Sequence, residues 1–380
     1  MNKRGLAGRE YYIDLLDKNT NSFRKGEGKN IALLGPRRCG KTSILKHHAQ
    51  NSGEIISVYI DVEKISLNPE NFAVEFVWNI IQSSVKKTFS ESEGIGFLEK
   101  IKKHEAELGK NSFSLIKTIE NELLKIKPDQ RLLVKSAFDF ANVFGTEKNK
   151  KILLLLDNFE NIFDLNNFSQ VKDAISLIDY GAKYVRYVVA SSAVRECISL
   201  LKNFECFEIK NLEKSKCVEL IESIIGNANR KACEEIFSFS KGHPFVAVSI
   251  AKRFLETKDA KKAFLVELLV KDSPVYNYCS ESYNYYYNRA RGQTLLKTIL
   301  KVVASEELRL SEIAKKIYRS APVTKAILER LIDADIIHKK DNKFYFGDDV
   351  LRVWVKLTSD GYDFIDSIDD KILEEAGKKL

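Results

Sequence analysis

Residues 35 to 42 have the types and the spacing of a phosphate-binding loop. They read Gly35-Pro36-Arg37-Arg38-Cys39-Gly40-Lys41-Thr42, which fits the pattern G-x-x-x-x-G-K-[ST]. Glycines let successive backbone N–H groups curl around phosphate oxygens, because no side chain restricts the turn. The lysine reaches the terminal phosphates, and the threonine hydroxyl completes the coordination shell of Mg²⁺. The loop, extended by Ser43, therefore predicts a site for ATP or ADP with Mg²⁺.

Two flanking elements must hold this loop in place. An apolar run at 31–34 predicts a strand before it, and the segment from Ser43 onward predicts a helix after it. The N-terminus of that helix adds a partial positive charge to the phosphate site. This strand–loop–helix setting is what the pattern requires, and it argues against a chance match in a surface loop.

A carboxylate at the end of a second apolar run supplies the other half of the predicted site. Asp157 follows four leucines, and on a strand beside the loop it would contact Mg²⁺ through the water shell of the ion. The next residue, Asn158, cannot act as a general base. Glu160 is the candidate to polarise the attacking water if its segment turns inward, or else it is a solvated residue at a helix start. The pattern thus predicts nucleotide binding directly, and hydrolysis only through Glu160.

Two serines end a further apolar run at 184–190. A hydroxyl there can meet the γ-phosphate and position water, which makes Ser192 a catalytic candidate beside Lys41, Asp157 and Glu160. Serines such as Ser191 and Ser192 also end strands for turn chemistry alone. Arg195, one turn later, is either a contact to the phosphates or to a neighbouring subunit, or an ordinary surface arginine.

The composition narrows the class of protein. Of the 380 residues, 44% are apolar and 30% are charged, which fits a globular protein. No stretch approaches the roughly 18 consecutive apolar residues of a membrane span, and the basic first residues lack the apolar segment of a secretory signal. The scattered cysteines have no C-x-x-C spacing and indicate reduced thiols in a cytoplasmic protein. A net charge of +8 permits a nucleic-acid partner without requiring one.

Strands and helices alternate through the first half of the chain, which predicts βαβ units and a parallel sheet. Strands are predicted at 30–34, 55–61, 151–156, 184–190 and 205–209. Helices are predicted at 10–16, 69–89 and 167–179, and helices rich in lysine and glutamate at 95–145 form an insertion or a lengthened crossover. Helices then continue from 214 to 290. Helices at 293–304, 311–318 and 322–333 precede a hairpin of 336–338 with 344–346, the order of a winged helix-turn-helix.

These elements predict an α/β fold with three parts: a P-loop NTPase core with a parallel sheet, an all-α lid and a C-terminal winged helix-turn-helix domain. The predicted core spans 1–212, with a helical insertion at about 90–149. The predicted lid spans 213–290. The winged-helix domain with further C-terminal helices spans 291–380.

Motifs spread over nearly the whole chain resemble those of archaeal-type ATPases of the STAND class, relatives of AAA+ proteins. The loop GPRRCGKT is close to the GPRR-x-GKT form of that group, and Gly8-Arg9-Glu10 resembles its opening GRE motif. LLLLDNFE is similar to its second motif, which ends D-E-F-Q, and Gly242-His243-Pro244 to the G-H-P of its helical lid. The stretch 346–354 is similar to the F-x-D-x-x-L-R-x-W that follows the wing.

The resemblance implies an AAA+-like ATPase, and it gives Arg9, His243 and Pro244 roles at the adenine and ribose side of the nucleotide. A proline at the first position of a helix is by itself ordinary capping. The chain departs from the group at Tyr12, which replaces a second glutamate of the N-terminal motif. It also departs after Asp157, where D-N-F-E replaces D-E-F-Q, and this departure bears on catalysis.

The C-terminal module is a candidate for contact with double-stranded DNA. The segment 321–331 has Pro322 at the first position of the helix predicted at 322–333, and Val323, Ile327 and Leu331 on one face, as expected of a recognition helix. Residues 291–345 contain twelve Lys or Arg and seven Asp or Glu. The candidate phosphate contacts are Arg319, Lys325, Arg330, Lys339 and Lys340, with Lys343 in the wing. Alternatively the module binds a protein, since acidic residues dilute its basic face.

Together these features predict a Mg-ATP-binding ATPase that acts as a nucleotide-dependent molecular switch, with slow hydrolysis coupled to rearrangement of the lid and the winged helix. The main alternative is an initiator-like or regulatory DNA-binding protein in which ATP is a structural ligand. A self-associating scaffold is a third, and no membrane partner is predicted. The tyrosines at 276–287 are expected to pack between domains, with base stacking as the alternative.

Overall fold

The computed structural model describes residues 6–51, 53–85, 101, 108–226, 229–291, 294–362 and 369–380. The chain forms two compact units. The first ends at Ile209 and excludes Pro36–Gly40, and the second comprises Pro36–Gly40 and Lys210–Leu380. The tip of the predicted phosphate loop therefore groups with the second unit, whereas the two ends of the loop belong to the first. Residues 86–89, the last of the helix predicted at 69–89, and part of the predicted insertion, at 90–100 and 102–107, lie outside the described residues.

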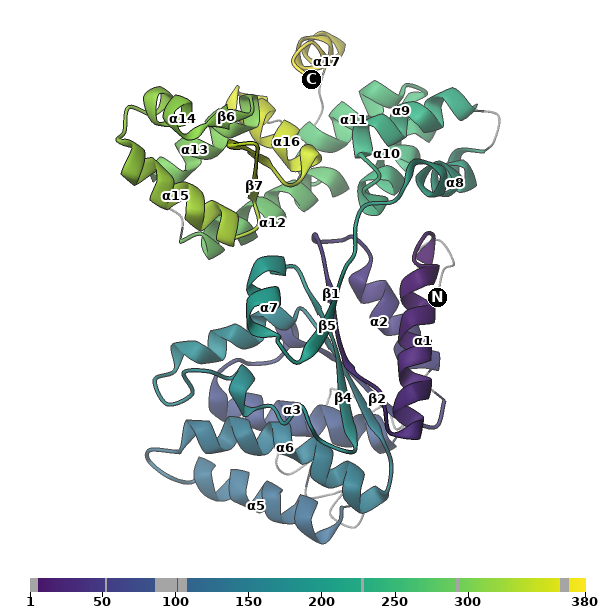
Figure 1. The fold of residues 1–380 in the computed structure, drawn as a ribbon. Coiled ribbons are helices and arrows are strands. Elements are labelled where there is room, and N and C mark those ends of the chain that lie inside the picture. Colours follow the sequence, from purple (N-terminus) through teal and green to yellow (C-terminus); the bar gives the residue numbers. More distant parts are fainter. Residues whose placement is uncertain are drawn as a thin grey trace. The chain divides into compact units, whose positions relative to one another are not determined.

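The first unit is built on a five-stranded parallel sheet in the order β2-β3-β4-β1-β5 (Figure 1). The strands are β1 (Asn30–Leu34), β2 (Ile56–Asp61), β3 (Ile152–Asp157), β4 (Val185–Ser191) and β5 (Phe204–Glu208). β1 and β3 are buried along their whole length, as continuous apolar runs predict for strands covered on both faces. The register pairs Leu34 with Ser191 and Asp61 with Asp157. The carboxyl ends of β1, β2, β3 and β4 thus meet at one edge, and all five predicted strands are present.

Helices cover this sheet. They are α1 (Glu10–Lys25), α2 (Lys41–Asn51), α3 (Pro69–Val85), α5 (Lys110–Leu123), α6 (Gln130–Lys148) and α7 (Val194–Leu200), with short 3₁₀ helices η2 (Val62–Lys64), η4 (Phe159–Asn167) and η5 (Ile175–Leu177). α3 packs on α6 through Phe72, Phe76 and Phe138, whose ring centroids lie 5.2 to 5.6 Å apart. α2, which follows the phosphate loop, contacts β2, β3 and β4. The position of Lys41 at the start of α2 is therefore fixed by the sheet.

One predicted helix is absent, and another is longer than predicted. The helix predicted at 167–179 is replaced by the end of η4, a loop and η5. There the Asn166 side chain accepts from the Ala174 N–H at 2.8 Å and the Asp173 side chain from the Ser176 N–H at 3.3 Å, so local side chains compete with helical bonds. The helix predicted at 10–16 continues to Lys25, and it ends at Gly26, whose φ of 105° is the left-handed geometry of a helix C-cap.

The second unit begins with five helices, α8 (Lys214–Ile225), α9 (Arg230–Ser240), α10 (Pro244–Thr257), α11 (Ala260–Leu269) and α12 (Pro274–Arg289). It continues with α13 (Thr294–Ser305), β6 (Leu308–Arg309), α14 (Leu310–Lys316), α15 (Ala321–Asp333), β7 (Ile337–Lys340), β8 (Lys343–Phe346), α16 (Asp349–Ser359) and α17 (Asp370–Gly377). The predicted hairpin is present as β7 and β8, and the unpredicted β6 extends it to three antiparallel strands in the order β6-β8-β7.

The buried face of α15 differs by one residue from the prediction. Ile327 and Leu331 are buried as expected, but Val323 is 45% exposed and Thr324 is buried in its place. The buried positions 324, 327, 328 and 331 form one helix face, and Val323, four residues before Ile327, lies at the margin of that face.

Three of the six tyrosines of α12 contact α16 or its N-cap residue. The rings of Tyr276 and Tyr283 lie 5.7 and 5.9 Å from that of Trp354, and the buried Tyr278 donates its hydroxyl to Asp348. These three tyrosines therefore contribute to the packing of α12 against α16 inside the second unit. Within the described ranges, no helix has the length and apolar character that crossing a bilayer requires.

Candidate functional site

Lys41 is a buried cation at the carboxyl edge of the sheet. Only 7% of the residue is exposed, and its ammonium donates to the Gly35 carbonyl at 2.7 Å and to the Ser192 hydroxyl at 3.1 Å. The side chain thus folds back over the first residue of the loop. Because Lys41 also starts α2, its charge adds to the positive end of that helix dipole. The arrangement offers a positive charge and helix N–H groups to an anion.

The loop backbone includes two left-handed residues. Gly40 has φ 107°, where only glycine is unstrained, and Arg38 has φ 55° despite its side chain. Such a conformation at a non-glycine residue costs on the order of 1 kcal/mol and persists only where neighbouring contacts hold it. At the start of the loop, the Gly35 N–H donates to the Ser191 carbonyl at 3.2 Å. The cysteine of the loop, Cys39, is fully buried.

The order of the strands corrects one expectation. Asp157 was expected on a strand beside the phosphate loop, but β4 lies between β1 and β3. The residues that end β4, which pairs with β1, therefore lie beside the start of the loop. Of these, the Ser191 hydroxyl accepts from the Ala193 N–H at 3.0 Å, which is turn chemistry, and the Ser192 hydroxyl binds Lys41.

Glu160 turns inward and joins the same cluster. It is 4% exposed, and its two carboxylate oxygens each lie 3.2 Å from the Ser192 N–H that donates to them. Its alternative interpretation as a solvated residue at a helix start is therefore wrong. Ser192 thus links Lys41 to Glu160: its hydroxyl binds the Lys41 ammonium, and its backbone N–H binds the Glu160 carboxylate. A carboxylate has about four lone-pair positions, so its two oxygens can accept several hydrogen bonds at once.

A second acidic group ends β2 and β3. Asp157 is 1% exposed, and its carboxylate accepts from the Tyr59 hydroxyl at 2.9 Å and from the Asn158 N–H at 3.1 Å. Asn158 has φ 51°, and its side-chain amide donates to Asp61 at 2.8 Å. Burial, and then the negative charge of Asp157, raise the pKa of Tyr59, so that phenol stays a donor.

Sequence reasoning missed Tyr59 and Asp61. The signal was available, because residues 59 and 61 are alternate positions at the end of a predicted strand and so share one face.

The donor set suits a hard cation. Mg²⁺ prefers oxygen ligands and keeps several waters, and the candidates Thr42 and Asp157 offer a hydroxyl and a carboxylate. Over the ranges that the structure describes, no three or more His, Cys, Asp or Glu side chains gather in a metal-binding group. A site that uses one or two protein oxygens together with water and phosphate fits these residues, whereas an all-protein cage does not.

The Gly-His-Pro segment lies at the start of α10 in the second unit. Gly242 has φ 76°, and a Cβ there would lie 2.2 Å from the Leu212 carbonyl oxygen, so only glycine fits. His243 is the 2% exposed N-cap, and Pro244 occupies the first turn. The Nδ1 of His243 accepts from the Val246 N–H at 3.5 Å, and its Nε2 lies 3.1 Å from the carbonyl oxygen of Arg37. Arg9, the third residue of this predicted set, is the buried N-cap of α1 in the first unit.

The candidate DNA contacts lie in and near α15 and the hairpin, and several have local partners. Arg330 donates to the backbone carbonyls of Ala290, at 2.9 Å, and of Arg291. The Nζ atom of Lys325 lies 3.6 Å from the Oε1 atom of Glu329. Arg319 donates to the Tyr318 carbonyl. The Lys339 ammonium lies 5.7 Å from the centre of the Phe344 ring, and Lys340 is exposed on β7.

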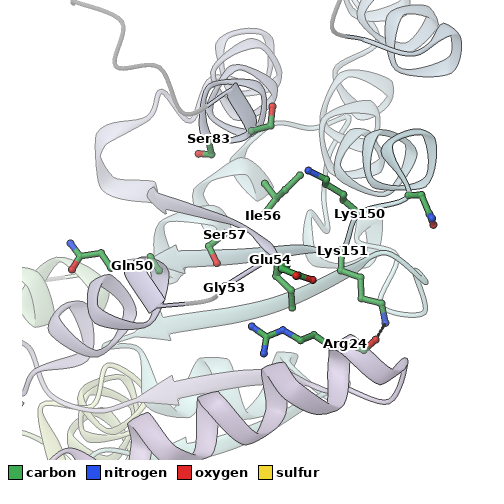
Figure 2. Close-up of a pocket in the computed structure, with 13 residues that line it drawn as sticks. Arg24, Gln50, Gly53, Glu54, Ile56, Ser57, Ser83, Lys150 and Lys151 are labelled. Carbon is green, nitrogen blue, oxygen red and sulfur yellow. Dashed lines mark hydrogen bonds between the residues drawn. The ribbon is translucent and has the colours of Figure 1, made fainter.

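A separate polar cavity of about 850 Å³ lies near the amino ends of β2 and β3 (Figure 2). Its lining includes Arg24, Glu54, Ser57, Lys150 and Lys151. In Figure 2 the Lys151 ammonium points to the backbone of Arg24, to whose carbonyl it donates at 3.1 Å. None of the predicted site residues lines this cavity. It is therefore distinct from the candidate site.

Comparison with known proteins shows the fold. No family model matches the sequence, and no curated protein matches it. Among solved structures, a Walker-type ATPase of Pyrococcus abyssi superposes with a TM-score of 0.61 at 17% identity, over 90% of this chain and 95% of that one. The ORC2 protein of Aeropyrum pernix, solved as ADPNP-ADP complexes, gives a TM-score of 0.51 at 12% identity over 93% and 95%. The chain thus has the α/β fold of P-loop nucleoside triphosphatases, as the sequence predicted.

Proposed function

We propose that the chain binds ATP with Mg²⁺ at residues 35–43 and hydrolyses it slowly, as a nucleotide-dependent molecular switch. The observation that carries this proposal is the linkage of Lys41, Ser192 and Glu160. It unites the cation of a phosphate-loop pattern with a buried carboxylate from a different strand end. A buried carboxylate beside a buried ammonium at the mouth of a glycine-containing loop suits phosphoryl transfer to water.

Each residue has a distinct role in this proposal. Lys41 exchanges its bond to the Gly35 carbonyl for the terminal phosphates, and loop N–H groups bind phosphate oxygens. Ser192 stays between the phosphate and Glu160. Glu160 accepts a proton from the attacking water as general base. Asp157 and Thr42 are the residues that would hold Mg²⁺, which supplies charge neutralisation at the phosphates when bound.

The proposed family, the residues at the base and ribose, and the winged helix follow from the sequence motifs. We propose membership of the STAND class, with the roles at the base and ribose of the nucleotide that the resemblance implies for Arg9, His243 and Pro244. We also propose that α13, α14, α15 and the β6-β8-β7 sheet form a winged helix. The element order and the three-stranded sheet support this assignment. The second unit then rearranges with the nucleotide.

The nucleotide site is tested by removing the Lys41 ammonium. Lys41→Ala is expected to weaken Mg-ADP binding at least about 100-fold, because a charge-assisted contact to phosphate is lost inside a buried site. Lys29→Ala is the matched control, since Lys29 is an exposed cation of the same unit paired with Glu205. Calorimetric titration of both variants measures the effect. Retained affinity in Lys41→Ala, with a circular dichroism spectrum like that of the wild type, would refute the site.

A second candidate function is DNA binding through the C-terminal module. The excess of twelve basic over seven acidic residues at 291–345 favours it. The bonds of Arg330 to backbone carbonyls count against that residue as a phosphate contact. Turnover and mass measured with and without duplex DNA, across a salt series, separate the candidates. Binding that weakens steeply with salt, without any turnover, would favour the regulatory DNA-binding protein over the switch.

A further inference from the structure

The two arginines of the phosphate loop belong to the second unit and have specific partners within it. Arg38 Nη2 lies 2.7 Å from Glu281 Oε2, and its guanidinium lies 4.5 Å from the centre of the Phe245 ring. The Arg37 guanidinium lies 4.9 Å from the centre of the Tyr285 ring. Glu281 and Tyr285 are four residues apart on α12, so they present one face of that helix to neighbouring arginines.

The backbone at Arg37 also has a partner within this unit. Because His243 Nδ1 accepts from the Val246 N–H, its Nε2 is the nitrogen that carries the proton and donates to the Arg37 carbonyl at 3.1 Å. In a trans peptide the carbonyl and the next N–H point in opposite directions. The bond therefore turns the Arg38 N–H away from His243. It also fixes the peptide plane beside the left-handed Arg38.

α12 is a firm support for these contacts. On other positions of the helix, Tyr278 donates to Asp348, the N-cap residue of α16, and Tyr283 packs on Trp354 of α16. Tyr278 is also fully buried beside His243, with ring centroids 4.8 Å apart. A site built on packed helices is held more closely than one held by loops alone.

We propose that Glu281 and Tyr285, with Phe245 and His243, are positioning residues that hold Arg37 and Arg38 and thereby set the affinity of the phosphate loop for nucleotide. The proposal rests on the nucleotide site proposed above and adds a means of regulating it. Amides fixed before binding lose less entropy when phosphate arrives, so contacts that fix the loop raise affinity. A shift of α12 would release the arginines and lower the affinity of the loop for nucleotide.

The test compares variants of the partners, which are not themselves phosphate ligands. Glu281→Gln is expected to raise the Kd for Mg-ADP about two- to five-fold, the worth of an exposed ion pair. Tyr285→Leu is expected to raise the Kd for Mg-ADP by a similar factor, because it removes the aromatic ring that contacts the Arg37 guanidinium. Tyr285→Phe keeps this ring and is expected to keep the wild-type Kd. The matched control is Glu256→Gln, which breaks the Arg253–Glu256 pair, also at 2.7 Å in the second unit and away from the loop.

A double-mutant cycle separates positioning from direct contact. If Arg38 acts through Glu281, then Arg38→Gln and the double variant Arg38→Gln/Glu281→Gln lose the same affinity. If the fold-losses of affinity of the two single variants multiply in the double variant, the proposal is overturned. It is also overturned if Glu281→Gln binds Mg-ADP as tightly as its control Glu256→Gln, and Tyr285→Leu as tightly as Tyr285→Phe. Thermal midpoints, expected to match those of the controls, show that folding is intact. A wild-type chain that binds no Mg-ADP refutes the proposed function itself, whereas wild-type binding with unaffected variants refutes only the positioning role.

Discussion

Glu160→Gln separates catalysis from binding at the candidate site. The substitution keeps the shape of a 4% exposed side chain and removes its negative charge. A glutamine can still accept from the Ser192 N–H through its one oxygen, but it cannot take a proton from water. Loss of a general base lowers rates by a factor of about 10² to 10⁴. The turnover number is therefore expected to fall at least about 100-fold, or about 2.7 kcal/mol of activation free energy.

Binding and stability are expected to change far less. The Kd for Mg-ADP should stay within about three-fold, because Glu160 makes no contact with phosphate in the proposed arrangement. The free energy of unfolding is expected to fall by about 1 kcal/mol, because a hydrogen bond to a charged acceptor becomes one to a neutral acceptor. For a unit of this size that corresponds to about 2–4 °C in the melting temperature.

The assay is phosphate release under single-turnover conditions, with calorimetric titration of Mg-ADP on the same preparation. Glu205→Gln is the control, because it removes an exposed carboxylate of the same unit that pairs with Lys29. Wild-type turnover in Glu160→Gln would show that water is activated elsewhere. Parallel loss of Mg-ADP binding and turnover would instead assign Glu160 a structural role at Ser192.

The remaining predictions concern Asn158 and His48. Asn158→Glu restores the glutamate of the D-E-F-Q motif, but the variant loses the bond to Asp61 and sets two carboxylates together, so we expect no gain in turnover and about 1–3 kcal/mol lower stability in urea denaturation. An Asn158→Glu variant as stable as the wild type would contradict this reasoning. Burial lowers the pKa of His48 in the folded chain, against the opposing effect of Asp17, whose Oδ1 lies 3.0 Å from Nδ1. Since the unfolded chain then binds the proton more tightly, the stabilisation by neutral His48 is present above about pH 6.5 and is lost as pH falls below it. Urea midpoints at pH 7.5 and 5.5 should therefore differ more for the wild type than for His48→Gln, and equal differences would count against this assignment.

The sequence determined the local features of the site. The pattern of the phosphate loop, the apolar strands that precede it and Asp157, and the Gly-His-Pro segment each depend on residues close together in the chain. Backbone geometry and burial at those positions follow from residue type, as at Gly40, whose φ of 107° only glycine adopts without strain. The central strands β1, β3 and β4 could be predicted because continuous apolar runs are typical of strands buried on both faces.

Only the tertiary structure decided which strand ends meet. The insertion of β4 between β1 and β3 brings Ser192, and not Asp157, beside Lys41, and strand order is set by packing of the whole sheet. The same holds for Glu160, which turns inward because a Ser192 amide from another strand binds it. Side chains far apart in sequence, such as Arg38 and Glu281, pair for reasons of three-dimensional packing that no local pattern records.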